Sequence, residues 1–276
     1  GTGRNRPVPA RIFLLLLLSL PALARPASAV SGCAADRIDD RARVSLVQDG
    51  DTLLLADGRR LRLIGINTPE LGKAGRGAEP GALVARDRLR QLLFSNQQQV
   101  QLRFDRERHD RYGRLLAHAF IADGRNLTEL LLTEGAGAQL VVPPNTWQAN
   151  CYRTAVDTAR SGRRGVWALP SHQARPVETL DLHSEGFHVV SGRVTHVSES
   201  ASAIWVNLAG NFALRIERED LPQFQGFDLD ALPGGDIEAQ GWIHARSGQL
   251  RMPLRHPAAL RIVRTATPSV SGSPLQ

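Results

Sequence analysis

The sequence predicts a mainly β protein of the α+β class, in which a strand-rich domain with three helices precedes a second, smaller β-rich domain. Three observations favour this fold class. Short apolar runs end at Asp-Gly pairs between residues 43 and 66, and longer segments with helical spacing follow them. Beyond residue 185 only short alternating runs occur. A chain of 276 residues is long enough for two such domains, each with its own core.

The first domain, predicted over residues 30–172, begins with strands at 44–47 and 52–55 and a single returning strand at 60–66. The pair Asp57-Gly58 predicts a two-residue hairpin turn, which would place Asp51 opposite Ile64. The remaining elements follow from apolar spacing and capping residues. We expect helices at 80–94, 126–135 and 146–161, and a further strand pair at 100–104 and 115–121.

The second domain, predicted over residues 186–265, follows a linker at 173–185 that is poor in apolar residues. Its alternation favours a small antiparallel barrel, similar to an OB fold, with strands at 189–197, 203–208, 212–216, 236–243 and 250–254. The tail 266–276 is predicted to be disordered. Arg251, Arg255 and His256 are candidates for contacting nucleic acid, although a solvated face is the favoured interpretation.

The first 29 residues have the layout of a secretory signal peptide. Arg4, Arg6 and Arg11 precede an apolar run at 12–20, and cleavage is expected after Ala29. The apolar run is too short for a membrane-spanning anchor. Cleavage removes four arginines and no acidic residue, so the formal charge falls from +7 to +3. Export to the periplasm or the external medium is therefore expected, with no transmembrane segment in the mature chain.

Two cysteines, Cys33 and Cys151, are the complete set in this chain. In an oxidising compartment an even number favours pairing, so a disulfide between them is the preferred interpretation. The alternative is that residues 30–33 form a lipobox and Cys33 carries a lipid anchor. Arg25 and Pro26 interrupt the apolar run that such a signal requires, which disfavours the lipid.

The best candidates for chemistry lie in the first domain, whose net charge of +5 suits a polyanionic partner. A bend near the end of the returning strand would gather Asp51, Arg62, Asn67, Thr68 and Glu70 at one site. Hydrolysis of a phosphodiester requires such a set: oxygen ligands for a hard cation, a carboxylate for the water, and guanidinium groups for the developing charge.

A second arginine is supplied by the segment RERHDRYGR at 106–114. Most of its arginines are expected to be solvated. Arg114 follows Gly113, where a sharp turn can direct one guanidinium inward, so that Arg62 and Arg114 would hold one phosphate together. No zinc motif and no nucleotide-binding P-loop occurs in the sequence, which leaves zinc and nucleoside-triphosphate chemistry without support.

These blocks resemble the staphylococcal nuclease (thermonuclease) family over residues 43–169. The order of DGDT (49–52), RLIGINTPE (62–70), DRYGR (110–114) and a final helix ending in GVW (165–167) follows the order of that family. The resemblance implies a five-stranded OB-type barrel with three helices. It also implies Ca²⁺-dependent cleavage of DNA and RNA, preferring single strands and leaving 3′-phosphates.

Carried over by position, the resemblance implies that Asp51 is a metal ligand and that Thr68 contributes its backbone carbonyl. In the best-known members the position of Asn67 holds a ligating aspartate. The asparagine keeps a carbonyl oxygen but loses one negative charge, so weaker Ca²⁺ binding is expected rather than lost chemistry.

The resemblance further implies that Glu70 is the general base and that Arg62 and Arg114 contact the phosphate. Tyr112, with Arg111 beside it, is expected to bind substrate. The family's paired tyrosines have no counterpart in the segment GAGAQLVVPPN at 135–145, which puts base stacking in question.

The sequence therefore predicts an exported, monomeric, metal-dependent endonuclease acting on single-stranded DNA or RNA. The alternative is a non-catalytic module that binds nucleic acid or protein on the same barrel, and a third hypothesis is an envelope protein whose second domain matters most. The enzyme is favoured because Arg62, Glu70 and Arg114 all remain, whereas unpaired charged groups are costly to keep once their ligand is lost.

Overall fold

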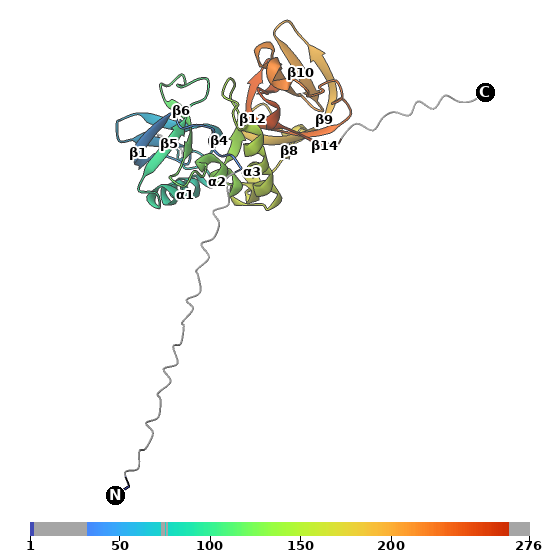
Figure 1. Ribbon diagram of the computed structural model, residues 1–276. Coiled ribbons are helices and arrows are strands. Elements are labelled where there is room, and N and C mark those ends of the chain that lie inside the picture. The colour runs from blue at the N-terminus through green and yellow to red at the C-terminus, as the bar shows by residue number, and fades with distance from the viewer. Residues whose placement is uncertain (3–31, 73–74, 76, 265–276) are drawn as a thin grey trace, which may run out of the picture.

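The computed structural model describes residues 1–2, 32–72, 75 and 77–264, which form two β-barrels lying side by side (Figure 1). Apart from residues 1–2, the predicted signal peptide lies outside the described residues, as does the predicted tail 266–276. Within the described part of the chain, no helix combines the length and the apolar character needed to cross a membrane.

The first barrel contains five strands hydrogen-bonded in the closed order β1-β2-β3-β6-β5, with β3 and β6 parallel. Fully buried leucines such as Leu53, Leu61 and Leu102 fill its interior. The strands of this part of the chain are β1 (Asp40–Val47), β2 (Thr52–Leu55), β3 (Arg60–Leu63), β4 (Gly65–Asn67), β5 (Gln99–Arg103), β6 (Leu115–Phe120) and β7 (Ala138–Leu140). Its helices are α1 (Ala82–Phe94), α2 (Leu127–Thr133), α3 (Ala149–Ser161) and the 3₁₀ helices η1 (Gly165–Ala168) and η2 (Pro170–His172).

The single strand predicted over residues 60–66 is two strands. At Gly65 the backbone takes a φ of 92°, which favours glycine, and a β-carbon there would lie 2.4 Å from the ring of Tyr152. After this bend β4 leaves the barrel and pairs with β7, a strand that the sequence did not reveal, so that Asn67 lies opposite Ala138. The sequence had required a bend near the end of the returning strand to gather the site residues, and the bend at Gly65 provides it.

The predicted register of the first hairpin is wrong by one residue. Thr52 lies opposite Arg62, whereas the predicted pairing of Asp51 with Ile64 would have placed Leu53 there. The Leu55 N–H donates to the Arg59 carbonyl. Three residues therefore form the turn, with Gly58 at a φ of 88°, which is typical of a three-residue hairpin loop.

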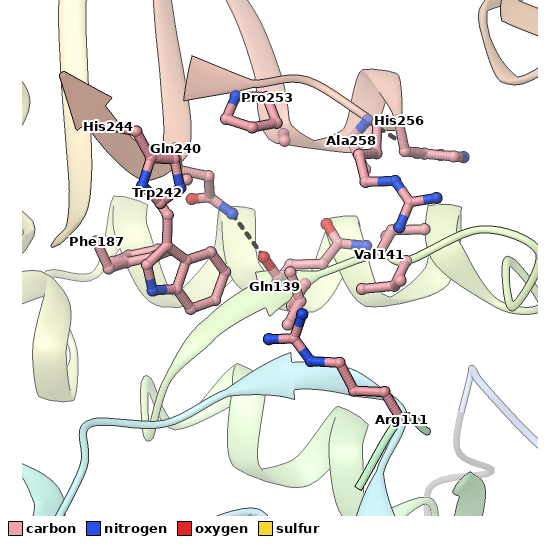
Figure 2. A pocket seen from close by; sticks show the side chains of 15 residues that line it. Arg111, Gln139, Val141, Phe187, Gln240, Trp242, His244, Pro253, His256 and Ala258 are labelled. Atoms are coloured by element: carbon pink, nitrogen blue, oxygen red, sulfur yellow. Dashed lines mark hydrogen bonds between the residues drawn. The ribbon is translucent and has the colours of Figure 1, made fainter. Parts of the chain in front are cut away.

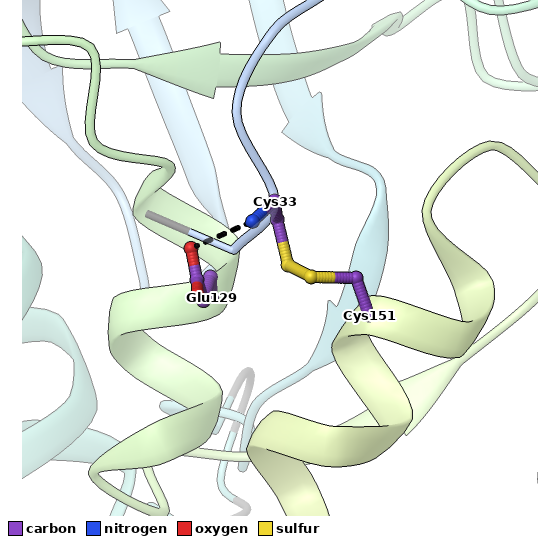
Figure 3. Close-up of side chains that lie close together, drawn as sticks. All are labelled: Cys33, Glu129 and Cys151. Carbon is purple, nitrogen blue, oxygen red and sulfur yellow. Dashed lines mark hydrogen bonds between the residues drawn. A yellow bond between two sulfur atoms is a disulfide. The ribbon is translucent and has the colours of Figure 1, made fainter. Parts of the chain in front are cut away.

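The disulfide between Cys33 and Cys151 is confirmed (Figure 3). It joins the segment before β1 to α3 across a sequence separation of 118 residues. Glu129 on α2 lies beside it and accepts hydrogen bonds from the N–H groups of Gly32 and Cys33, at 3.1 and 3.4 Å. A sulfur atom in a disulfide is not available for lipid attachment, so the lipid alternative at Cys33 is incompatible with this bond.

The second barrel repeats the topology of the first. Its ring runs β9-β10-β11-β13-β12, β12 closes it by pairing with β9, and β11 and β13 are parallel. Counted along the chain, the third strand of each barrel pairs with the fifth, β3 with β6 and β11 with β13, which confirms the prediction of two OB-type units. The strands are β8 (Arg175–Pro176), β9 (Gly186–Glu199), β10 (Ala203–Leu208), β11 (Phe212–Glu217), β12 (Asp236–Arg246), β13 (Gln249–Pro253) and β14 (Leu260–Arg264), with 3₁₀ helices η3 (Val177–Thr179), η4 (Arg218–Phe224) and η5 (Pro257–Ala259).

The segment predicted as a linker, 173–185, carries β8 and η3 in the structure. β8 pairs with β9 through Arg175 and Val190, and Val177 is buried in the second hydrophobic core. The segment therefore packs on the second barrel, while the precise limits of the two domains stay a prediction.

Candidate active site

The residues predicted to hold a cation come together around Asp51, in the turn between β1 and β2. Its Oδ2 atom accepts hydrogen bonds from the backbone N–H of Thr68 at 2.9 Å and from the Thr68 hydroxyl at 3.1 Å. Both residues are buried, with 6% and 3% of their surface exposed. Asn67 immediately precedes Thr68 at the end of β4, so the three predicted ligand residues lie together.

Arg62 on β3 joins this oxygen cluster. Its Nη2 atom lies 3.1 Å from Oδ2 of Asp51 and 3.5 Å from Oδ1 of Asn67. Its Nη1 atom donates to the backbone carbonyls of Leu63 and Ile66, at 2.7 and 2.8 Å. These four contacts fix the guanidinium beside the two side-chain oxygens on which a cation would rest.

Two glycines allow the segment containing Asn67 and Thr68 to approach so closely. A β-carbon at Gly137, just before β7, would lie 2.4 Å from the Asn67 carbonyl oxygen. A β-carbon at Gly50 would lie 2.7 Å from the Thr68 hydroxyl and 2.8 Å from the β-carbon of Ala85 on α1. The position of the site therefore depends on close contacts at Gly50 and Gly137 that a larger residue would obstruct.

A cleft of about 470 Å³ extends from Arg62 along the loop that precedes β6. Arg111, Tyr112 and Arg114 line it together with Arg62, so the structure brings all four predicted substrate-contacting residues to one cavity. The Arg111 Nη2 atom donates to the Tyr112 hydroxyl at 2.8 Å. Tyr112 is 60% exposed, which leaves its ring accessible at the cleft.

Glu70 is the predicted site residue that the structure leaves apart. It is exposed, two residues beyond Thr68, and is not among the residues that line the cleft. Its backbone N–H donates to the Glu79 carboxylate at 2.9 Å, and its carbonyl accepts from the Glu79 N–H at 2.8 Å. These two bonds fix the backbone at Glu70, while the residue itself is exposed to solvent.

Sequence reasoning missed Asp110, which positions Arg114. One oxygen of Asp110 accepts the Arg114 backbone N–H at 2.9 Å, and the other accepts Nε of its guanidinium at 2.7 Å. Burial pushes the pKa of Asp110 upward, but these hydrogen bonds outweigh burial, and the pKa lies below its ordinary value. Its place in DRYGR, four residues before Arg114, was the available signal.

Asp49 was also missed, although it opens the DGDT motif. Its Oδ1 atom accepts the backbone N–H of Asp51 at 3.0 Å. Burial and the neighbouring charge of Asp51 raise the pKa of Asp49 to about 6. The two carboxyl groups of Asp49 and Asp51 lie in one partly buried turn, and this arrangement favours the binding of a positive charge there.

Comparison with known proteins places this site in a family. The family model described as "Staphylococcal nuclease homologue" matches residues 60–169. The thermonuclease of Staphylococcus intermedius is 33% identical over 127 residues, which is 45% of this chain and 74% of that protein. The chain belongs to the staphylococcal nuclease family. The family match begins at β3, after Asp51 and the first two strands of the first barrel, and it ends before the second barrel.

Other members of the staphylococcal nuclease family give similar matches. Endonuclease YncB of Bacillus subtilis (strain 168) is 34% identical over 125 residues, which is 44% of this chain. The match spans 58% of YncB, so the chain covers less than two thirds of that relative. An uncharacterized endonuclease of Escherichia coli O157:H7 is 30% identical over 140 residues, covering 47% of this chain and 78% of that protein.

The donor groups of the predicted ligand residues are of the type that binds a hard cation. Asp51 offers a carboxylate, Asn67 an amide oxygen and Thr68 a backbone carbonyl, which are the oxygen ligands that Ca²⁺ prefers. Asp49 adds a second carboxyl group to this turn, and burial together with the charge of Asp51 raises its pKa to about 6. Because Asn67 is neutral where the resemblance implies an aspartate, this set of ligands carries one negative charge fewer.

Proposed function

We propose that the mature chain is an exported, monomeric, Ca²⁺-dependent endonuclease that hydrolyses DNA and RNA, prefers single strands and leaves 3′-phosphates. The observation that carries the proposal is the double role of Arg62. One guanidinium contacts the oxygen cluster of Asp51 and Asn67 and also lines the cleft that holds Arg114. A phosphate bound at Arg62 would therefore lie beside the cation ligands and within the basic cleft.

In this proposal each residue has one task. Arg62 and Arg114 bind the scissile phosphate and stabilise the charge that develops on its oxygens. Glu70, exposed to water two residues beyond Thr68, orients or deprotonates the attacking water molecule. A bound cation would neutralise phosphate charge and hold the substrate at Asp51, Asn67 and the carbonyl of Thr68. Tyr112 and Arg111 contact the neighbouring nucleotide.

Export is supported by the first 29 residues and is consistent with the disulfide. The arginine-flanked apolar run and the Ala27-Ser28-Ala29 segment direct secretion, and the bond between Cys33 and Cys151 suits an oxidising compartment. The enzyme would act in the periplasm or outside the cell.

The second candidate function is a non-catalytic nucleic-acid-binding module. The contacts of Arg62 favour it, because its guanidinium already supplies a positive charge to Asp51 and Asn67. Because Arg62 already compensates the negative charge of Asp51, such a site requires no cation in order to bind a phosphate. The two candidates therefore differ in whether Ca²⁺ has any effect.

The deciding experiment measures hydrolysis of a fluorescent single-stranded oligonucleotide by the mature chain during a Ca²⁺ titration. We expect Ca²⁺-dependent cleavage, at least about a hundredfold lower kcat for Glu70→Gln, and a lower Ca²⁺ requirement for Asn67→Asp. Glu134→Gln is the matched control, since Glu134 is an exposed glutamate that pairs with Arg88 outside the cleft. Binding of DNA without any Ca²⁺-dependent cutting would reject the enzyme in favour of the binding module.

A further inference from the structure

A second cavity, of about 520 Å³, lies between the two barrels (Figure 2). Arg111 reaches it from the first barrel, and Trp242 reaches it from β12 on the opposite side. Arg111, Leu140, Val142 and Arg255 line both this cavity and the candidate catalytic cleft. The two hollows are therefore adjacent along one path that begins at Arg62 and continues onto the second barrel.

Direct contacts fix the second barrel beside this path. The Nε2 atom of Gln240 on β12 donates to the backbone carbonyl of Gln139 on β7 at 2.8 Å, and this bond is buried. Farther along the same strand, Glu238 forms an ion pair with Arg160 of α3. Trp242 follows Gln240 by two residues, so it projects from the same face of β12, where the barrels separate and the cavity opens.

Trp242 is suited to stack on a planar ligand. It lies opposite Phe187 of β9, and the two rings meet edge to face at 5.2 Å between centroids and 73° between planes. This contact supports the indole, while 38% of the residue remains exposed. An exposed, supported tryptophan beside a basic cleft is the kind of surface on which nucleic-acid bases stack.

The charge of the cavity favours an anionic ligand. None of the fifteen described residues that line it is acidic, whereas Arg111, Arg255, His244 and His256 all contribute to its wall. Arg255 is held by Asp220, with 3.1 Å between Nε and Oδ2, and its side chain is still 39% exposed. A strand of phosphates leaving the catalytic cleft would thus meet the guanidinium groups of Arg111 and Arg255, and none of the described lining residues is a carboxylate.

We propose that this cavity is a subsite for single-stranded nucleic acid, in which Trp242 stacks on a base next to the nucleotide bound at Arg62 and Arg114. The inference rests on the proposed function, since it extends the same cleft. It also accounts for the sequence of the first barrel, where residues 135–145 contain no aromatic side chain. The second barrel supplies an aromatic surface in addition to Tyr112, where residues 135–145 of the first barrel offer none.

The test measures binding rather than cleavage, with the mature two-barrel chain in EDTA and fluorescein-labelled oligothymidylates of about two and about eight nucleotides. In wild type the longer strand is expected to bind more tightly. Trp242→Leu removes the stacking surface but keeps an apolar side chain, and should weaken binding of the longer strand about tenfold. Trp242→Phe keeps an aromatic ring and should stay within about threefold of wild type.

Trp205→Leu is the matched control, because Trp205 lies on β10 of the same barrel and lines neither cavity. It should bind like wild type. An unchanged affinity for Trp242→Leu, an equal loss for Trp205→Leu, or no preference of wild type for the longer strand would overturn the subsite.

The same chains in Ca²⁺ separate this inference from the proposed function. If wild type shows the Trp242-dependent binding but cuts no substrate, the subsite stands and the enzyme is rejected. If wild type cuts but Trp242→Leu has an unchanged KM for the longer strand, the enzyme stands and the subsite is rejected.

Discussion

The disulfide between Cys33 and Cys151 should supply a large part of the stability of the first barrel. The bond closes a loop with a sequence separation of 118 residues, which contains every strand of that barrel. Breaking it leaves the folded contacts in place but frees the unfolded chain to explore many more conformations. In the chain-entropy model, a loop of this length corresponds to about 5 kcal/mol in the free energy of unfolding.

The two cysteines differ in burial, which separates the cross-link from the packing. Cys33 is fully buried in the hydrophobic core, whereas Cys151 is only partly buried. Both single substitutions by alanine break the same bond, so each should lower the free energy of unfolding by about 4 to 5 kcal/mol. Cys33→Ala should cost about 1 kcal/mol more, because it also leaves a small void.

The assay is unfolding in urea, monitored by tryptophan fluorescence. Trp147 and Trp167 report on the first domain. Oxidised wild type, reduced wild type and the two single variants are compared, the variants under reducing conditions so that the free thiol stays reduced. Reduced wild type should resemble Cys151→Ala. If reduced wild type and Cys151→Ala both unfold within about 1 kcal/mol of the oxidised protein, the entropic argument is refuted.

Two further predictions concern the packing of the site and the buried histidine. Gly137→Ala should lower the free energy of unfolding by about 1 to 3 kcal/mol and reduce activity, because the new β-carbon would lie 2.4 Å from the Asn67 carbonyl oxygen; wild-type stability in urea unfolding would contradict this. Burial lowers the pKa of His118 from 6.5, although Asp105 opposes the shift, so the unfolded chain takes up a proton before the folded one. Folding stability should therefore fall as the pH decreases below 6.5, and His118→Gln should lose less stability than wild type between about pH 7 and pH 5, measured by thermal unfolding.

The sequence predicted the elements well wherever a local pattern was sufficient. The strand at 203–208 has the predicted limits, and the helix at 127–133 is capped as expected, with Asn126 accepting the Glu129 N–H at 3.2 Å. The Glu129 side chain, however, bonds to the N–H groups of Gly32 and Cys33. A capping-box spacing thus indicated the helix start correctly but could not reveal a partner 96 residues away.

Short strands whose partners are distant were the elements that the sequence missed. β7 has three residues, and its pairing with β4 depends on the bend at Gly65, which the sequence showed only as one glycine in an apolar run. The one-residue error in the hairpin has a similar origin, since two- and three-residue turns share the Asp-Gly signal. A local pattern carries no information on which turn the barrel selects.

For the candidate site, the sequence by itself determined the residue types: a carboxylate, an amide, two arginines and a glutamate. Only the tertiary structure decided their geometry. It brought Asp51 within 3.1 Å of Arg62, left Glu70 in solvent, and placed Trp242 of the second barrel against the extended cleft. The physical reason is that these contacts join segments far apart in the chain, held by close backbone approaches at Gly50 and Gly137 and by packing between two barrels.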